Sequence, residues 1–105
     1  MIPQKKIQQI VNTYENLEKE LASGSIDKKD IAKKSKEYSS IGEIINEAKG
    51  YLKFDQEKKE LEKILDDKNS EKDMLQLAKN ELDLLLKKKE QYEKKLKLYL
   101  LPRDE

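Results

Sequence analysis

Apolar residues recur at helical spacing along nearly the whole chain. In the first segment, about residues 3–22, they alternate by three and four positions: Ile7, Ile10, Tyr14, Leu17 and Leu21. Because positions three and four apart lie on one face of a helix, this spacing predicts an amphipathic helix with a narrow apolar seam. Polar residues cover its other face, so we expect one or two neighbouring helices to pack against it.

A longer second helix is predicted over about residues 27–67. It carries two apolar stripes, formed by Ile31, Tyr38, Ile45 and Leu52 and by Ile41, Ile44, Ala48, Tyr51, Phe54, Leu61 and Leu65. Two stripes offer apolar surface to two partners. Asp27 is expected to cap the first turn. Gly42 and Gly50 each cost about 1 kcal/mol relative to Ala in a helix interior, so a bend is allowed over residues 39–42.

A third helix is predicted over about residues 71–99, with Ser70 as its cap and Asp73 three residues later in a capping-box-like pair. Its seam again alternates by three and four: Leu75, Ala78, Leu82, Leu85, Lys89, Tyr92, Leu96 and Tyr99. Lys89 interrupts this seam at the level of Gly50. Its methylene stem is expected to pack over the missing side chain while the ammonium reaches solvent; a binding role for Lys89 is the alternative.

The connections at residues 23–25 and 66–70 are short, so consecutive helices should run antiparallel. Counting outward from the turns pairs Leu17 with Ile31, Ile10 with Tyr38, Leu85 with Phe54 and Tyr92 with Ala48. The first helix is too short to cover the far half of the second. We therefore expect an all-α fold, an elongated antiparallel three-helix bundle from which a two-helix, coiled-coil-like hairpin projects by about 30 Å.

Composition supports long, thin helices over a thick core, because only 35% of the 105 residues are hydrophobic and 43% are charged. The net charge of +1 indicates no overall field suited to a nucleic acid. Residues 87–97 are rich in lysine and residues 60–73 in acids, and a solvated helix face is the simpler interpretation of both. The chain has no Cys and no His, which excludes disulfides, thiolate metal sites and imidazole chemistry.

We therefore expect no cofactor, no metal site and no small-molecule substrate. The N-terminal residues lack the apolar run of a secretory signal, and no stretch approaches the roughly 20 apolar residues of a membrane span. We expect a cytoplasmic protein without a membrane partner.

The C-terminal end carries a more specific signal. Pro102 should end the last helix by about residue 100, leaving residues 100–105 as an extended linker into a next domain. The sequence Leu100-Leu101-Pro102-Arg103-Asp104 resembles the tail that precedes the central domain in bacterial class I peptide chain release factors of the UAA/UAG-reading type. Equivalents also occur, in order, for Lys36-Glu37-Tyr38 with Ile41, Leu65-Asp66-Asp67, and Met74 with Ala78 and Glu81-Leu82.

The resemblance implies a role in translation termination. In that family the complete factor enters the ribosomal A site, reads the stop codon with a tripeptide loop and hydrolyses peptidyl-tRNA with a Gly-Gly-Gln loop. Neither motif occurs in these 105 residues, so no catalytic or decoding residue is assigned, and we expect no enzymatic activity. The resemblance implies that residues 1–99 form an N-terminal helical domain that lies toward the ribosomal stalk base and helps dock the factor.

The acidic turn between the second and third predicted helices is the candidate protein-contact site, because its charge should repel ribosomal RNA. Its acidic residues are Asp66, Asp67, Glu71 and Asp73. One alternative is a helical-hairpin RNA-binding arm, which would need a basic face near the projecting tip. Another is a self-associating coiled coil, in which exposed leucines over residues 98–101 make the isolated fragment a homodimer.

Overall fold

A computed structural model describes residues 2–101 of the chain, and these contain four α-helices and no strand. The helices are α1 (Gln4–Ser23), α2 (Lys28–Gly42), α3 (Ile45–Asp66) and α4 (Lys72–Leu100). The predicted all-α class is confirmed. Residues 102–105 of the predicted linker lie outside the described residues. The same is true of most of the tail that carries the family resemblance.

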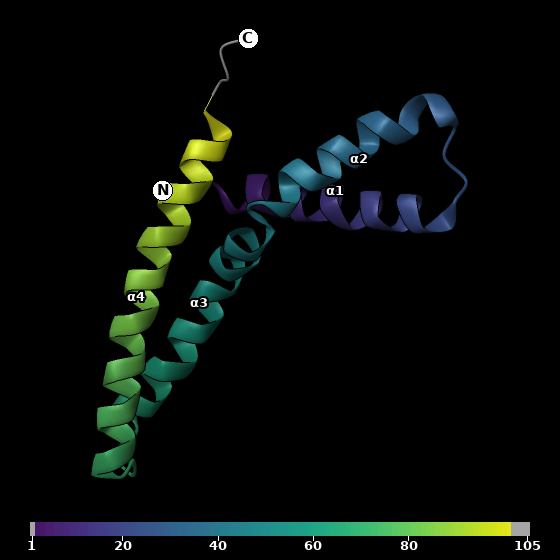
Figure 1. Ribbon diagram of the computed structural model, residues 1–105. Helices are drawn as coiled ribbons and strands as arrows, with labels where there is room; N and C mark the ends of the chain where they lie inside the picture. The colour runs from purple at the N-terminus through teal and green to yellow at the C-terminus, as the bar shows by residue number, and fades with distance from the viewer. Residues whose placement is uncertain (1, 102–105) are drawn as a thin grey trace.

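The helices form two antiparallel hairpins, α1–α2 and α3–α4, which diverge from a common junction (Figure 1). The molecule is elongated, with principal extents of 61, 33 and 19 Å. The single helix predicted over residues 27–67 is wrong, because the structure divides it into α2 and α3. The α1–α2 hairpin therefore does not lie alongside α3–α4 as the base of a long bundle, but projects to one side as an arm of its own.

The division falls at Glu43 and Ile44, immediately after Gly42. There the backbone amides of Glu43 and Ile44 donate to carbonyls three residues earlier, at 3.3 and 2.9 Å, which tightens the end of α2. Ile44 has φ −123° and ψ 6°, outside the α-helical region, and its carbonyl then accepts the first hydrogen bond of α3 from Ala48 at 2.9 Å. The weak helix preference of Gly42 makes this a favourable place to change direction.

The hydrophobic core sits at the junction of the two hairpins. It draws on α1 as far as Leu17, the end of α2, the start of α3 and the end of α4, and comprises Ile2, Ile7, Val11, Leu17, Ile41, Ile44, Ile45, Ala48, Tyr51 and Leu96. Ile7 and Leu96 are fully buried. All four helices contribute to this core, and the two-helix arms extend from it (Figure 1).

In the α3–α4 hairpin, the ring of Tyr92 packs directly on Gly50, where an added Cβ would lie 2.6 Å from the ring. About one turn further along α4, the Lys95 ammonium lies 2.9 Å from the Glu47 carboxylate. The two contacts place Tyr92 close to Ala48, the residue it was predicted to face. The expectation for Lys89 is wrong. Tyr92 rather than the lysine stem covers Gly50, and the Lys89 ammonium lies 4.4 Å from the centroid of the Phe54 ring.

In the α1–α2 hairpin, the predicted register is wrong by about one turn. Tyr38 stacks on Tyr14 rather than on Ile10, with ring centroids 4.6 Å apart and an angle of 13° between the ring planes. The reason is the width of the connection, which occupies residues 24–27 rather than ending at Ser25. Each added loop residue displaces the facing positions toward the end of α1.

Candidate functional site

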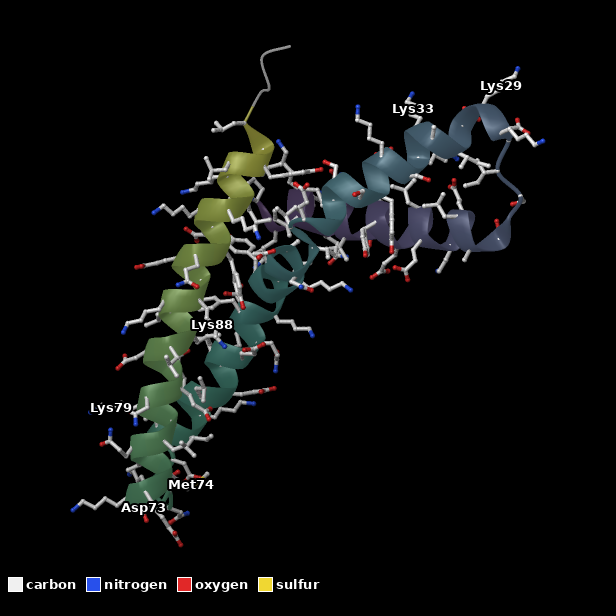
Figure 2. All side chains as sticks on the ribbon, in the orientation of Figure 1. Lys29, Lys33, Asp73, Met74, Lys79 and Lys88 are labelled. Carbon is white, nitrogen blue, oxygen red and sulfur yellow. The ribbon has the colours of Figure 1, made fainter. Side chains whose placement is uncertain are left out.

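The structure places the four predicted site residues together at the far end of the α3–α4 hairpin. Asp66 is the last residue of α3, Asp67 and Glu71 lie in the connection, and Asp73 is in the first turn of α4. All four are exposed. Figure 2 shows Asp73 at the tip, beside the exposed Met74. The tip also holds Lys68 and Lys72, so four acids and two lysines give residues 66–73 a net charge of −2.

The connection at this tip is held by local hydrogen bonds. The carboxylate of Asp67 accepts from the Asn69 amide at 2.9 Å, an arrangement that tightens turns. Ser70 does not cap α4 as predicted: its hydroxyl donates to the Ile64 carbonyl at 2.8 Å and closes the end of α3. Glu71 takes the N-cap position of α4 without a side-chain capping bond. Asp67 therefore has a structural role.

The other three carboxylates at the tip make no such bond. Within residues 2–101, Asp66, Glu71 and Asp73 take part in no ion pair and in no side-chain hydrogen bond. Their charges face solvent and are free to meet a cationic partner.

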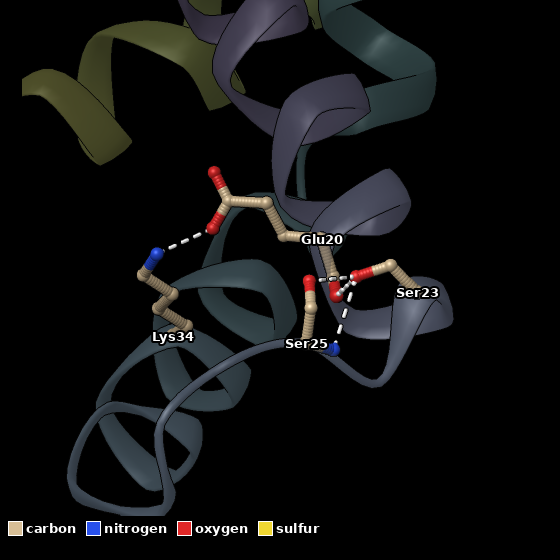
Figure 3. Close-up of polar contacts among 4 residues, drawn as sticks. All are labelled: Glu20, Ser23, Ser25 and Lys34. Atoms are coloured by element: carbon tan, nitrogen blue, oxygen red, sulfur yellow. Dashed lines mark hydrogen bonds and ion pairs between the residues drawn. The ribbon is translucent and has the colours of Figure 1, made fainter.

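A second projecting end is formed by the α1–α2 turn (Figure 3). Gly24 ends α1 with a φ of 70°, a left-handed conformation that favours glycine. The Ser23 hydroxyl lies 2.7 Å from both the Glu20 carbonyl and the Ser25 hydroxyl. Across the turn Lys34 pairs with the Glu20 carboxylate, and this hydrogen bond raises the pKa of Lys34. These contacts hold the two helices together at the exposed end of the arm.

The start of α2 differs from the prediction. Asp27 occupies the N-cap position, but its side chain makes no capping hydrogen bond. Its backbone carbonyl accepts instead from the amides of Asp30 and Ile31, at 2.9 and 3.2 Å. The expected side-chain cap is therefore absent.

A pair of stacked tyrosines, which sequence reasoning missed as a pair, fastens the middle of the same arm. The Tyr14 hydroxyl donates to that of Tyr38 at 3.1 Å, and Tyr38 donates to the Glu18 carboxylate at 2.9 Å. The bonds to Tyr14 and then Glu18 raise the pKa of Tyr38. The sequence signal was the presence of one tyrosine in each facing stripe, but only the correct register brings the two rings together.

At the junction, Tyr51 anchors the start of the chain. Its buried hydroxyl accepts from the Ile2 amide at 3.2 Å and donates to the Ile2 carbonyl at 3.0 Å. The Gln4 side chain donates to Asp55 at 2.7 Å, one turn further along α3. These bonds fix the base of α1 against α3 and so help to set the direction of the α1–α2 arm.

The side chains described above bind and position one another. Among residues 2–101, no cluster of three or more His, Cys, Asp or Glu side chains is placed to hold a metal ion. No helix in the same range has the length and apolar character needed to cross a membrane. The described residues thus form two projecting helical arms joined at a small core.

Comparison with known proteins identifies which domain this is. The PCRF domain family matches residues 10–105, and the chain belongs to that family. It is 50% identical over 105 residues to peptide chain release factor 1 of Pelagibacter ubique (strain HTCC1062), an alignment that covers 100% of this chain and 29% of that protein. The family resemblance seen in the sequence is thereby confirmed.

Two further relatives show the same pattern. The chain is 37% identical over 101 residues to peptide chain release factor 1 of Helicobacter pylori (strain G27), covering 94% of this chain and 28% of that protein. It is 33% identical over 103 residues to the protein of the same name from Bartonella tribocorum (strain CIP 105476 / IBS 506), covering 98% and 28%. The chain thus spans less than a third of the length of these relatives. No solved structure matches it.

Proposed function

We propose that this chain acts in translation termination as the N-terminal docking domain of a peptide chain release factor that reads UAA and UAG codons. The observation that carries the proposal is the 50% identity to a peptide chain release factor 1 across all 105 residues. The partner is then the ribosome, in the region of the stalk base, and the site of action is the cytoplasm.

The form of the molecule supports docking rather than chemistry. The chain offers helix faces and two turns at the ends of a 61 Å molecule, and it contains no Gly-Gly-Gln sequence that could position water beside an ester. A domain of this kind contributes to binding of the whole factor, whereas decoding and hydrolysis belong to other domains.

The proposal is tested by measuring release rate against factor concentration at a stop codon. The isolated chain should release no peptide. A release factor lacking residues 1–99 should retain codon-dependent release, with a half-saturating concentration raised more than its maximal rate is lowered, because a docking domain contributes binding energy common to ground and transition states. A lowered maximal rate with unchanged half-saturation would mean that the domain shapes the catalytic state, and docking would be the wrong function.

Within this function, the α3–α4 tip serves as a contact for a basic protein surface. Its unpaired carboxylates repel RNA phosphates and attract lysine and arginine side chains. Asp66→Asn, Glu71→Gln and Asp73→Asn together should weaken ribosome binding and reduce its association rate without changing helix content. The matched control is Glu57→Gln, Asp83→Asn and Glu90→Gln, which removes the same charge from exposed positions away from the tip. Equal losses in both triple variants would remove the tip from the docking surface.

Self-association of the isolated chain stays a prediction. Leu98 and Leu101 are 66% and 58% exposed at the end of α4, an arrangement that a second copy could cover. Sedimentation at increasing chain concentration measures it directly, and a constant monomer mass would rule it out.

A further inference from the structure

The outer face of α2 carries a row of three lysines. Lys29, Lys33 and Lys36 are four and three residues apart, so they lie on one side of the helix, and all three are exposed. Tyr38 and Lys34, which contact α1, lie on the other side. Figure 2 shows Lys29 and Lys33 projecting from α2 on the side away from α1, with Lys29 near the far end of the arm.

The three lysines of this row form no ion pair within residues 2–101. Residues 28–37 contain five lysines and two acids, Asp30 and Glu37. Of these lysines only Lys34 forms an ion pair within residues 2–101. Of the six lysines of residues 87–97, two are ion-paired, Lys89 with Glu93 and Lys95 with Glu47. Residues 28–37 carry a net charge of +3 on a chain whose net charge is only +1, and the three lysines of the row all present their charge to solvent.

Helix stability does not account for Lys29. It lies in the first turn of α2, where the helix dipole is positive and disfavours cations. Departures from such a stabilising rule are expected at functional sites.

The chemistry of the row distinguishes between partners. Protein interfaces are anchored by buried aromatic and apolar side chains and are depleted in lysine. The lysine row contains no large apolar residue, because the exposed Ile31 lies on a different side of α2. Nucleic-acid backbones are instead bound by lysines and hydroxyl groups, and Ser40 continues the row at the next four-residue step. Lys29 to Lys36 spans about 10 Å along the helix axis, a length over which a nucleic-acid strand presents several phosphates.

We propose that Lys29, Lys33 and Lys36 bind the phosphate backbone of RNA. The inference deepens the docking function and rests on it for the ribosome as the source of that RNA. It divides the labour between the two arms, with RNA bound by the basic face of α2 and a basic protein surface bound by the acidic α3–α4 tip.

The direct test is an NMR titration of the ¹⁵N-labelled chain with a short RNA duplex. Amides of residues 28–40 should shift more than those of any other segment. Three phosphate contacts predict that affinity falls about 20- to 40-fold between about 50 and 200 mM salt. Lys29→Gln, Lys33→Gln and Lys36→Gln together should lower the logarithmic salt slope by about two to three. An α2 triple variant that binds the duplex as the parent chain does would overturn the proposal.

The matched control is Lys87→Gln, Lys94→Gln and Lys97→Gln, which removes the same charge from exposed positions of α4. This variant should retain the salt slope of the parent chain, and circular dichroism should show the same helix content in both triple variants. An equal loss of slope in the control would mean that net charge, rather than the α2 face, attracts RNA, and the assignment to α2 would be wrong.

Co-sedimentation with ribosomes separates this inference from the docking function. RNA binding through residues 28–40 without co-sedimentation would refute docking and leave the α2 assignment standing. Co-sedimentation without any RNA-induced shift in α2 would refute the α2 assignment and leave docking standing. If the α2 triple variant lost co-sedimentation while the parent chain bound no RNA duplex, the partner of the row would be an acidic protein surface, and the RNA proposal would be overturned.

Discussion

The contact between Gly50 and Tyr92 makes a sharp test of the packing between α3 and α4. A Cβ placed on Gly50 would lie 2.6, 2.7 and 3.0 Å from the Cε2, Cζ and hydroxyl oxygen of Tyr92, closer than side chains tolerate. Gly42 provides the comparison, because a Cβ there would meet only Cε2 of Tyr14, at an ordinary 3.8 Å. Gly50 lies inside α3, whereas Gly42 is the last residue of α2, so Gly42→Ala gains at most the full helix-propensity difference and meets no clash.

The expected free energies have opposite signs. Gly42→Ala should stabilise the fold by up to about 1 kcal/mol, the helix-propensity difference between Gly and Ala. Gly50→Ala has the same gain, but displacing the Tyr92 ring costs about 1 to 3 kcal/mol, the usual penalty for overpacking. The net change is a destabilisation of up to about 2 kcal/mol. Since each 1 kcal/mol shifts Tm by about 4 to 8 °C in a domain of this size, Gly42→Ala should raise Tm and Gly50→Ala should lower it.

Urea and thermal unfolding followed by circular dichroism at the helix band measure both variants. The Gly50→Ala substitution repeated in a Tyr92→Leu background provides a double-mutant cycle, in which removal of the clash should restore the propensity gain. If Gly50→Ala stabilised the parent chain as much as Gly42→Ala, Tyr92 would not be seated on Gly50 and the register of the hairpin would have to be revised.

Three further outcomes follow from the same structure. Tyr51→Phe should lower the free energy of unfolding in urea by about 1 to 3 kcal/mol, because it leaves the buried amide and carbonyl of Ile2 without their partner. An unchanged free energy of unfolding would show that water replaces the hydroxyl. Burial alone would raise the pKa of Glu47, but hydrogen bonds from Lys95 and the backbone hold this pKa below its ordinary value. The stabilising contribution of the Glu47 carboxylate should therefore be present above about pH 4.3 and be lost as pH falls through the folded-state pKa. Lys95→Gln should reduce this acid sensitivity, and an NMR titration of Glu47 checks the direction of the shift. Amides near Ile7 and Leu96 at the junction should exchange more slowly than those of either arm, whereas equal protection along α3 would contradict the separation into a core and two arms.

Much of the fold follows from local pattern. The three-and-four spacing of apolar residues indicated helices at residues 3–22 and 71–99, and the structure has α1 at Gln4–Ser23 and α4 at Lys72–Leu100. The level of Tyr92 on α3 was also close to prediction, because a short connection and two regular helices leave little freedom in a hairpin. The position of the acidic tip was predictable for the same reason.

The tertiary structure decided what local pattern could not. Ile41, Ile44, Ala48 and Tyr51 have the spacing of a continuous helix, and only their burial against α1 and α4 favours a break at Glu43 and Ile44 over a straight rod. That break turns the α1–α2 hairpin away from α3–α4 and makes it a second projecting arm. The sequence alone shows Lys29, Lys33 and Lys36 on one helix face, but whether that face meets another helix or solvent depends on contacts between residues far apart in the chain, which periodicity does not encode.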